Sequence, residues 1–355
     1  MNKHEGGVRL HEDAGRHLPT MTDVAAAAGV SQTTVSLVLN EVTGARLSQD
    51  TINRVHEAAE QLGYRVVRRG SRRAPASGLT AVGFVVNEIS TDPWMALALD
   101  GAREKAWEYG LTLSVAITRG DVEMEQAVLS RLMSQPLLGL IYGTIHTQRI
   151  VPSPQLKRAS AVLLNCYSSD RSLVSIVPAE VRGGRTATRS LAAAGHQRIA
   201  LIEGEALMDA SRDRLKGYRQ ALASYGIAFD PELVRPGNWE PSAGYQQTIE
   251  LMRLKSPPTA IFCGNDLMAL GCLEALAELG LRVPQDISVV GYDDRAIAQS
   301  TRPPLTTVLL PHFEMGAIAA DLILRKKVRR HGPQPQVKVP CPLVERDSIA
   351  PPRKL

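Results

Sequence analysis

The chain has 355 residues, of which 44% are hydrophobic, and a formal net charge of +5. A chain of this length is longer than an ordinary single domain with one hydrophobic core, so we expect two or three globular domains. It contains no run of about 18 apolar residues, which argues against a transmembrane helix. Its polar N-terminal segment lacks the apolar stretch of a signal peptide. The four cysteines are scattered without CxxC spacing, which fits buried, reduced thiols and a cytoplasmic location.

The stretch from Thr20 to Asn40 predicts two short helices joined by a tight turn. Thr20 or Thr22 can cap the first helix, and Gly29 suits the left-handed turn that ends it. Ser31 can cap the second helix, which leaves polar side chains on the outer face of its first turn. In helix-turn-helix proteins this second helix enters the DNA major groove. A helix pair with a glycine turn is also common in small cores, so the pattern alone leaves both interpretations open.

A third amphipathic helix is expected over residues 48–62, with Ile52, Val55, Ala59 and Leu62 on one face. Three short helices would then share one small core. The segment that follows has the glycine, proline and serine content of a linker. Its arginines, which suit contacts with DNA phosphates, are Arg65, Arg68, Arg69, Arg72 and Arg73.

Beyond residue 79 short apolar runs alternate with helical patterns. Repeated βα units imply parallel sheets with helices on both faces, and the number of strands favours two subdomains. Ligands of such sheets bind beyond the carboxyl ends of the strands, where this chain places amides and carboxylates that suit a polyhydroxylated ligand. Asn265 fits a ligand contact and a helix N-cap equally well, whereas Asp266 fits the N-cap better.

Several motifs occur in a fixed order along the chain. The pattern TxxDVAxxAGVSxxTVSxVLN begins at Thr20, and QLGY occupies residues 61–64. The later motifs are GHQRIA at 195–200, GNDLMALG at 264–271, DISVVGYDD at 286–294 and PPLTTV at 303–308. Together they resemble the lactose-repressor/galactose-repressor family of bacterial regulators over roughly residues 20–349.

The resemblance implies an α/β fold with an N-terminal all-α helix-turn-helix headpiece. A periplasmic-binding-protein-like core of two doubly wound parallel-sheet subdomains would follow. The expected boundaries are a disordered arm over 1–19, the headpiece over 20–65, an arginine-rich hinge over 66–79 and the core over 80–355. Within the core we expect a first subdomain over about 80–177 and 309–330, and a second over about 178–308 and 331–349.

The resemblance also implies a transcription regulator, most simply a repressor, that binds double-stranded operator DNA as a homodimer. A small polar effector, a sugar or sugar derivative, would bind between the subdomains and change operator affinity. No cofactor, metal, catalytic residue or membrane contact is expected, and the location is the cytoplasm, on the nucleoid when operator is bound. Activation instead of repression stays open. A dimer is favoured over a tetramer because no leucine-heptad tail follows Val344.

The residues expected to contact DNA in the headpiece are Thr20, Ser31, Gln32, Thr33, Thr34, Ser36, Leu37 and Asn40. The residues expected to contact the effector are Trp94, Asn165, Arg214, Trp239, Asn265 and Asp293. Among these, Arg214 can hold two ligand oxygens with its planar fork, and Trp239 can stack on a sugar ring. Trp94 fits a core position almost as well as a pocket position.

Three positions depart from the family pattern. Leu37 stands where members often have an arginine that reads guanine, so the preferred operator should differ at that base pair. Residues 65–73 show no leucine wedge, and Gly70 disfavours a regular hinge helix, which favours an arginine arm along phosphates or a narrow minor groove. Ala179 stands where members frequently have an aspartate.

Three other functions fit the sequence less well. An enzyme is disfavoured because no glycine-rich phosphate loop, GxSxG or HExxH motif occurs, and His146, His196 and His312 are isolated in sequence. A periplasmic sugar-binding protein would need an export signal and no headpiece. A DNA-binding protein without an effector switch is disfavoured by the polar residues that follow the strands.

Overall fold

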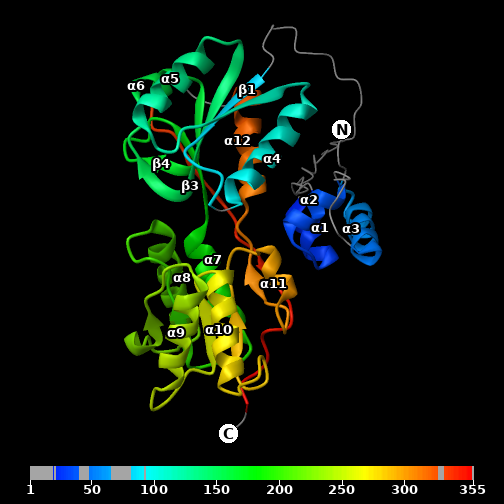
Figure 1. Ribbon diagram of the computed structural model, residues 1–355, viewed down its shortest axis with the longest axis vertical. Coiled ribbons are helices and arrows are strands. Elements are labelled where there is room, and N and C mark those ends of the chain that lie inside the picture. Colours follow the sequence, from blue (N-terminus) through cyan, green and yellow to red (C-terminus); the bar gives the residue numbers. More distant parts are fainter. Residues whose placement is uncertain are drawn as a thin grey trace, which may run out of the picture.

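The computed structural model describes residues 19, 21–39, 48–64, 81–91, 93–326 and 332–353. In Figure 1 two α/β lobes lie one above the other, and a small helical headpiece packs beside them. The headpiece helices are α1 (Met21–Ala28), α2 (Gln32–Leu39) and α3 (Gln49–Gln61). The chain therefore has the three-part organisation that its sequence pattern predicts.

Apolar spacing in the headpiece places one side chain of each helix at a shared centre. Val24, Val35 and Val55 are all fully buried there. Gly29 takes a φ of 62° in the turn between α1 and α2, a left-handed conformation that glycine adopts without a steric penalty. The hydroxyl of Ser48 accepts a hydrogen bond from the backbone N–H of Thr51 and caps α3.

The first lobe is built on a six-stranded sheet with the order β11-β5-β4-β3-β1-β2, in which every pair is parallel. Several of its strands are largely buried on both sides, because helices cover both faces. The strands are β1 (Ala81–Val86), β2 (Thr112–Ile117), β3 (Leu137–Ile150), β4 (Ala161–Ser168), β5 (Val174–Pro178) and β11 (Gln336–Val339).

Side chains of successive residues in β1 point to opposite faces of this sheet. Phe84 packs in the core beneath α4 and α12, and Val85 packs with Leu129 and Leu156 on the other side. The helices are α4 (Trp94–Glu108), α5 (Val122–Met133), α6 (Pro154–Arg158) and α12 (His312–Leu324).

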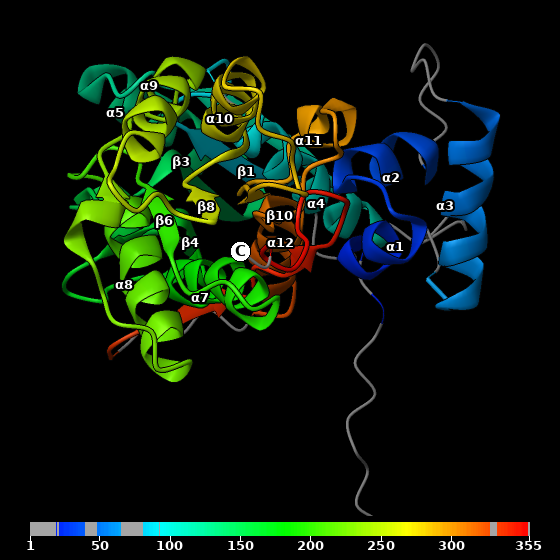
Figure 2. The ribbon, with the colours of Figure 1, turned by 90° about the horizontal axis from the view of Figure 1, so that it is seen from below.

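The second lobe contains a parallel sheet with the order β7-β6-β8-β9. Figure 2 shows α7 and α8 on one face of it and α9 and α10 on the other. Its strands are β6 (Ile199–Ile202), β7 (Val234–Arg235), β8 (Ala260–Cys263) and β9 (Ser288–Val290). Its helices are α7 (Glu180–Ala193), α8 (Asp209–Ser224), the short 3-10 helix η1 (Pro231–Leu233), α9 (Pro241–Met252), α10 (Asp266–Glu278) and α11 (Ala296–Ser300).

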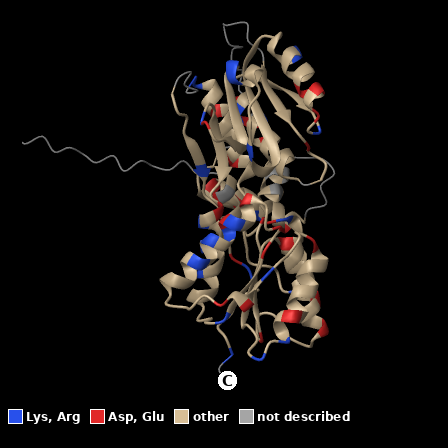
Figure 3. Cartoon of the chain, turned by 90° about the vertical axis from the view of Figure 1, so that its left-hand side faces the viewer, with Lys and Arg blue, Asp and Glu red and all other residues tan. Residues whose placement is uncertain are grey.

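The two faces of the second lobe differ in charge, as Figure 3 shows. Arginines recur along α7 at Arg182, Arg185 and Arg189, whereas Glu274 and Glu278 are exposed on α10. The small net charge of the chain therefore conceals an uneven distribution of cations and anions.

The chain crosses between the lobes three times, after β5, before α12 and after β11. A two-stranded antiparallel ribbon of β10 (Thr307–Val308) and β12 (Leu343–Val344) lies at the last two crossings. We expected residues 331–349 to belong entirely to the second subdomain, but β11 pairs with β5 in the sheet of the first. The strand reaches that sheet because its edge beside β5 is open, a tertiary pairing that local sequence does not reveal.

The four cysteines are buried and free, as their spacing predicts. No helix among the described residues has the length and apolar character needed to cross a bilayer.

Candidate functional site

The second headpiece helix begins with a capped turn. The hydroxyl of Ser31 accepts a hydrogen bond from the backbone N–H of Thr34 at 3.1 Å and also pairs with the Thr34 hydroxyl at 2.9 Å. This is the N-cap that the sequence predicts. Both side chains are buried, Ser31 at 1% and Thr34 at 8% exposure, so they position the helix end.

Gln32, in the first turn of α2, is not open to solvent, contrary to our expectation for the outer face of this helix. Gln32 is only 3% exposed, and its amide donates a hydrogen bond of 2.6 Å to the carboxylate of Glu314 on α12. The neighbouring Phe313 packs into the core of the headpiece. The headpiece is thus docked on the first lobe, through a contact between segments 282 residues apart that local sequence does not predict.

Several expected DNA-contacting positions lie outside the described residues: Thr20, Asn40, Arg65, Arg68, Arg69, Arg72 and Arg73. Helix α2 includes Thr33, Ser36 and Leu37, but their side chains are likewise not described.

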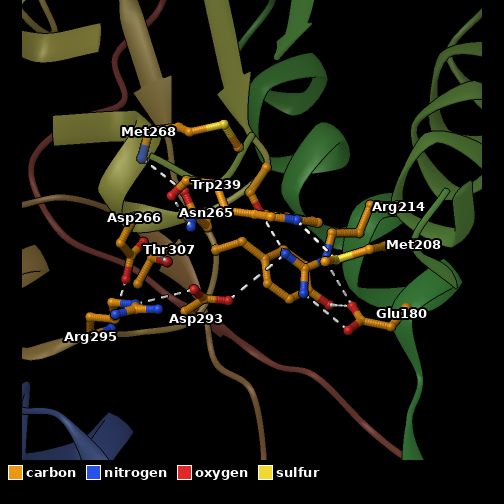
Figure 4. Close-up of polar contacts among 12 residues, drawn as sticks. Glu180, Met208, Arg214, Trp239, Asn265, Asp266, Met268, Asp293, Arg295 and Thr307 are labelled. Atoms are coloured by element: carbon orange, nitrogen blue, oxygen red, sulfur yellow. Dashed lines mark hydrogen bonds and ion pairs between the residues drawn. The ribbon is translucent and has the colours of Figure 1, made fainter. Parts of the chain in front are cut away.

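A cavity of about 250 Å³ lies between the two lobes. It is bordered by the ends of strands of both lobes, where parallel sheets commonly bind ligands. Figure 4 shows polar contacts on the second-lobe side of the site, where Glu180, Arg214 and Asp293 are among the residues that line the cavity. All six residues that we expected to contact an effector line this cavity: Trp94, Asn165, Arg214, Trp239, Asn265 and Asp293.

Arg214 is held by a buried carboxylate. Its Nε and Nη2 atoms donate to the two oxygens of Glu180 at 2.9 and 3.0 Å, and its Nη1 donates to the carbonyl of Gly264. The ring of Tyr292 lies 3.6 Å below the guanidinium, and the Tyr292 hydroxyl donates to Glu180 at 2.6 Å. Most of the donor capacity of Arg214 is therefore used within the protein, which fixes the direction of its fork.

Glu180 was missed by the sequence analysis. It is the first residue of α7 and is 4% exposed. The only signal was its position beside Ala179, where the family frequently has an aspartate. The carboxylate that pairs with Arg214 is thus supplied by the next residue along the chain.

Two asparagines of the cavity, Asn165 and Asn265, also make structural hydrogen bonds. The side-chain amide of Asn165 donates to the carbonyls of Thr144 and Ile145, and its oxygen accepts from the Thr147 hydroxyl. Asn165 has a φ of 55°, so these contacts hold a backbone conformation that few other residues tolerate.

Asn265 caps α10 while it faces the cavity. Its oxygen accepts from the backbone N–H of Met268 at 2.8 Å, and its amide donates to the carbonyl of Trp239 at 2.9 Å. The cap is therefore Asn265 and not Asp266, which we had favoured. Asp266 is buried instead, where it accepts from the Thr307 hydroxyl and the Arg295 backbone N–H. Burial and then the nearby Asp293 raise the pKa of Asp266 well above its usual range.

The two tryptophans line the cavity from opposite lobes. The indole of Trp239 lies against Gly204, where a Cβ atom would come within 1.9 Å of the ring, and its N–H points to the sulfur of Met208 at 3.0 Å. Gly204 therefore makes room for the ring. Trp94 begins α4 and stacks on His312 with the ring centroids 5.5 Å apart. The cavity is bordered by both aromatics.

Asp293 joins two cations at the centre of the site. Its carboxylate lies 3.8 Å from Nη1 of Arg214 and 3.5 Å from Nε of Arg295, and its φ is 112°. Together with Glu180 it balances the two guanidinium groups. The interior of the cavity therefore contains two cations and two carboxylates in contact with one another.

His312 was not recognised as a site residue because it is isolated in sequence. It lines the cavity, is 2% exposed and begins α12. Burial and then the charge of Arg214 lower the pKa of His312 to about 3. Its imidazole is therefore neutral near pH 7.

Two family models match the chain, one for bacterial regulatory proteins of the lacI family at residues 20–66 and one for a periplasmic binding protein-like domain at residues 188–349. The repressor PurR of Aliivibrio fischeri (strain MJ11) is 30% identical over 313 residues, which cover 87% of this chain and 92% of the relative. The chain belongs to the lacI family. A lac repressor dimer bound to operator and the anti-inducer ONPF matches with a TM-score of 0.63 and 29% identity, covering 94% of this chain and 100% of that one.

A second structure, the complex of the transcriptional regulator CelR with cellobiose, matches with a TM-score of 0.61 and 31% identity, over 93% of this chain and 99% of that one. The ribose operon repressor of Haemophilus influenzae is 29% identical over 87% of this chain and 92% of its own length. As a member of this family, the chain is a DNA-binding transcriptional repressor with an effector-binding core.

Proposed function

We propose that this repressor binds a pseudo-palindromic operator as a homodimer. A single headpiece offers few base contacts, so useful specificity requires two headpieces on two half-sites. The related lac repressor, solved as a dimer on its operator, supports this assembly. Sedimentation with and without an operator duplex tests it, and a monomer under both conditions would overturn it.

In the operator complex, Gln32 and its neighbours in the first turn of α2 would contact base edges. The arginines between residues 65 and 73 would neutralise phosphates. Because Gln32 is bonded to Glu314 on α12, the headpiece must leave α12 before this helix enters a major groove. DNA binding and headpiece docking therefore compete for the same side chain.

We infer that the effector is a neutral sugar or sugar derivative bound in the cavity between the lobes. The observation that carries this is the balance of charge, since Arg214 pairs with Glu180 and Arg295 with Asp293. An anionic ligand would have to displace one of these carboxylates. Glu205 and Glu240, exposed at the edge of the cavity, would repel it further.

The size and lining of the cavity support the same ligand class. A volume of about 250 Å³ suits a small ligand, and the Trp239 ring offers an apolar surface for sugar C–H groups. A related regulator was solved with cellobiose, and another relative is named for a ribose operon.

Thermal unfolding of the purified protein tests the ligand class. The probes are D-ribose, D-glucose, D-galactose and cellobiose, with glucose 6-phosphate as the charged match for glucose. A ligand that binds only the folded state raises the Tm, by an amount set by its concentration relative to Kd. We expect one neutral sugar to raise the Tm and glucose 6-phosphate to have no effect. Preferential stabilisation by the phosphate ester would overturn the neutral-sugar assignment.

A further inference from the structure

His312 is a buried polar side chain at the cavity for which the described residues supply no hydrogen-bond partner. Neither ring nitrogen makes a hydrogen bond to any of the described residues, and the side chain is 2% exposed. Leaving a buried donor or acceptor unpaired is unfavourable, because the group has lost its hydrogen bonds to water without gaining others. Native structures therefore leave few such groups unpaired without a compensating role.

The buried polar residues Arg214, Asn165 and Asn265 of the cavity are already engaged by the protein. Arg214 is bonded to Glu180, while Asn165 and Asn265 bond to nearby backbone groups. These groups shape the cavity and balance its charge, but their hydrogen bonds do not depend on a ligand. His312 differs from them because neither of its nitrogens is bonded to the part of the chain that the structure describes.

The chemistry of the ring limits what can satisfy it. Because His312 is neutral near pH 7, one nitrogen donates a hydrogen bond and the other accepts one. Arg214 is the cation that opposes protonation, and Arg295 lies over the face of Trp94 at 4.9 Å. Burial and the charge of Arg214 thus favour a neutral imidazole and a ligand group that bonds without charge.

We propose that His312 is a specificity-determining residue that bonds a hydroxyl group of the effector. This rests on the proposed sugar site and adds the group that selects among neutral sugars. A hydroxyl is both donor and acceptor, so it pairs with whichever nitrogen faces it. A sugar that lacks this hydroxyl would leave the imidazole unpaired, and sites of this type reject such analogues strongly.

Binding requires a small movement of the aromatic pair. Both nitrogens are covered in the present conformation, and the Trp94 ring stacks on His312 with an interplanar angle of 22°. Trp94 begins α4 and His312 begins α12, so a shift between their rings would expose the imidazole edge without unfolding either helix. The effector hydroxyl would then replace the covering contact with a hydrogen bond.

Two variants separate hydrogen bonding from packing. His312→Phe keeps a flat ring that can stack on Trp94 but removes both nitrogens. His312→Gln restores a donor and an acceptor. Calorimetry on full-length protein measures the Kd of the best-binding sugar from the set above and of each of its single-deoxy analogues. Operator binding without sugar checks that all three proteins are folded.

We expect His312→Phe to weaken binding of the parent sugar about tenfold or more, and His312→Gln to recover part of the lost affinity. We also expect wild type to discriminate against one deoxy analogue and His312→Phe to lose that discrimination. Binding of the parent sugar by His312→Phe within about twofold of wild type would overturn the proposal. Equal weakening of the parent and of every analogue would also overturn it, since that pattern indicates packing alone.

Failure of the sugar assignment gives a different result. In that case no sugar stabilises the wild-type protein, and the same three proteins are titrated with hypoxanthine and guanine, whose edges also carry donors and acceptors. If wild type binds a purine base and His312→Phe does not, the role of His312 is kept and the assignment of a sugar as effector is rejected. If neither class binds wild type, both proposals are rejected.

Discussion

At the scale of single residues, the site depends on charged and polar groups that are buried together. Arg214 has 5% exposure, yet it keeps its charge because Glu180 and Asp293 lie beside it. A buried pair of this kind is costly to break, since removing one partner leaves the other charge uncompensated. Arg214 therefore serves the stability of the second lobe as well as its ligand site.

Replacing Glu180 with Gln should destabilise the protein by about 3–5 kcal/mol, because the charge of Arg214 would lose its bidentate partner. Urea unfolding measures the effect. Glu205→Gln is the matched control, since Glu205 is exposed at the edge of the same cavity, and it should leave the midpoint nearly unchanged. Equal midpoints for Glu180→Gln and wild type would mean that solvent screens this pair.

The low pKa of His312 predicts a dependence of stability on pH. Its folded pKa of about 3 lies below the ordinary value of 6.5, so protons bind the unfolded chain more readily. The contribution of the neutral His312 to the free energy of unfolding is complete above pH 6.5 and is lost as the pH falls from 6.5 towards 3. At about pH 5 the loss is about 2 kcal/mol. Urea unfolding at about pH 7.5 and pH 5 should show a smaller difference for His312→Phe than for wild type, and identical differences would argue against a neutral buried imidazole.

At the scale of elements, α12 connects the effector cavity to the headpiece. Three consecutive residues at its start have different neighbours: His312 lines the cavity, Phe313 packs in the headpiece core, and Glu314 accepts from Gln32. A shift of this first turn would therefore affect both sites at once. This gives effector binding a short physical route to the docked headpiece.

Glu314→Ala should release the headpiece and tighten operator binding by roughly five- to tenfold. The reason is that a docked state lowers the fraction of protein competent to bind DNA. Fluorescence anisotropy with an operator duplex measures the change. Glu250→Ala, on the exposed side of α9 far from the headpiece, is the control and should bind as wild type does. Unchanged or weaker operator binding by Glu314→Ala would mean that docking does not compete with DNA.

The local sequence predicted where helices, strands and site residues lie better than it predicted which distant segments contact one another. The Ser31 cap, the left-handed Gly29, the βα units and the six cavity-lining residues follow from capping rules, periodicity and the resemblance. The pairing of β11 with β5, the Glu180–Arg214 pair and the Gln32–Glu314 contact join segments far apart in sequence. Such contacts depend on tertiary packing, and a single sequence contains no local pattern that specifies them.

At the scale of the whole molecule, two lobes joined by three crossings surround a charge-balanced cavity, and the headpiece rests on one lobe. Lobes of this kind can change their relative angle when a ligand bridges them. Because the cavity is lined by residues of both lobes and by the start of α12, a change of angle would alter the surface on which the headpiece docks.

The arginines between residues 65 and 73 lie outside the described residues, and their role is tested through salt dependence. Replacing Arg68, Arg69, Arg72 and Arg73 with Ala should weaken operator and random DNA alike. It should also flatten the salt slope by roughly 0.9 for each phosphate that is no longer neutralised. Gln32→Ala, which also removes the docking contact with Glu314, should instead lower the preference for operator over random DNA by about 1–3 kcal/mol, with little change in slope. An unchanged slope in the quadruple variant would assign the segment to a linker that does not touch DNA.

The central claim is that a ligand between the lobes controls operator affinity. The most direct measurement is the operator Kd of the full-length protein, by anisotropy, with and without a saturating amount of the sugar that raises its Tm most. We expect the sugar to change this Kd by roughly 5- to 150-fold, the usual range for coupled sites. Operator and ligand should change each other's affinity by the same factor. An identical operator Kd with and without a sugar that demonstrably binds the protein would contradict the account.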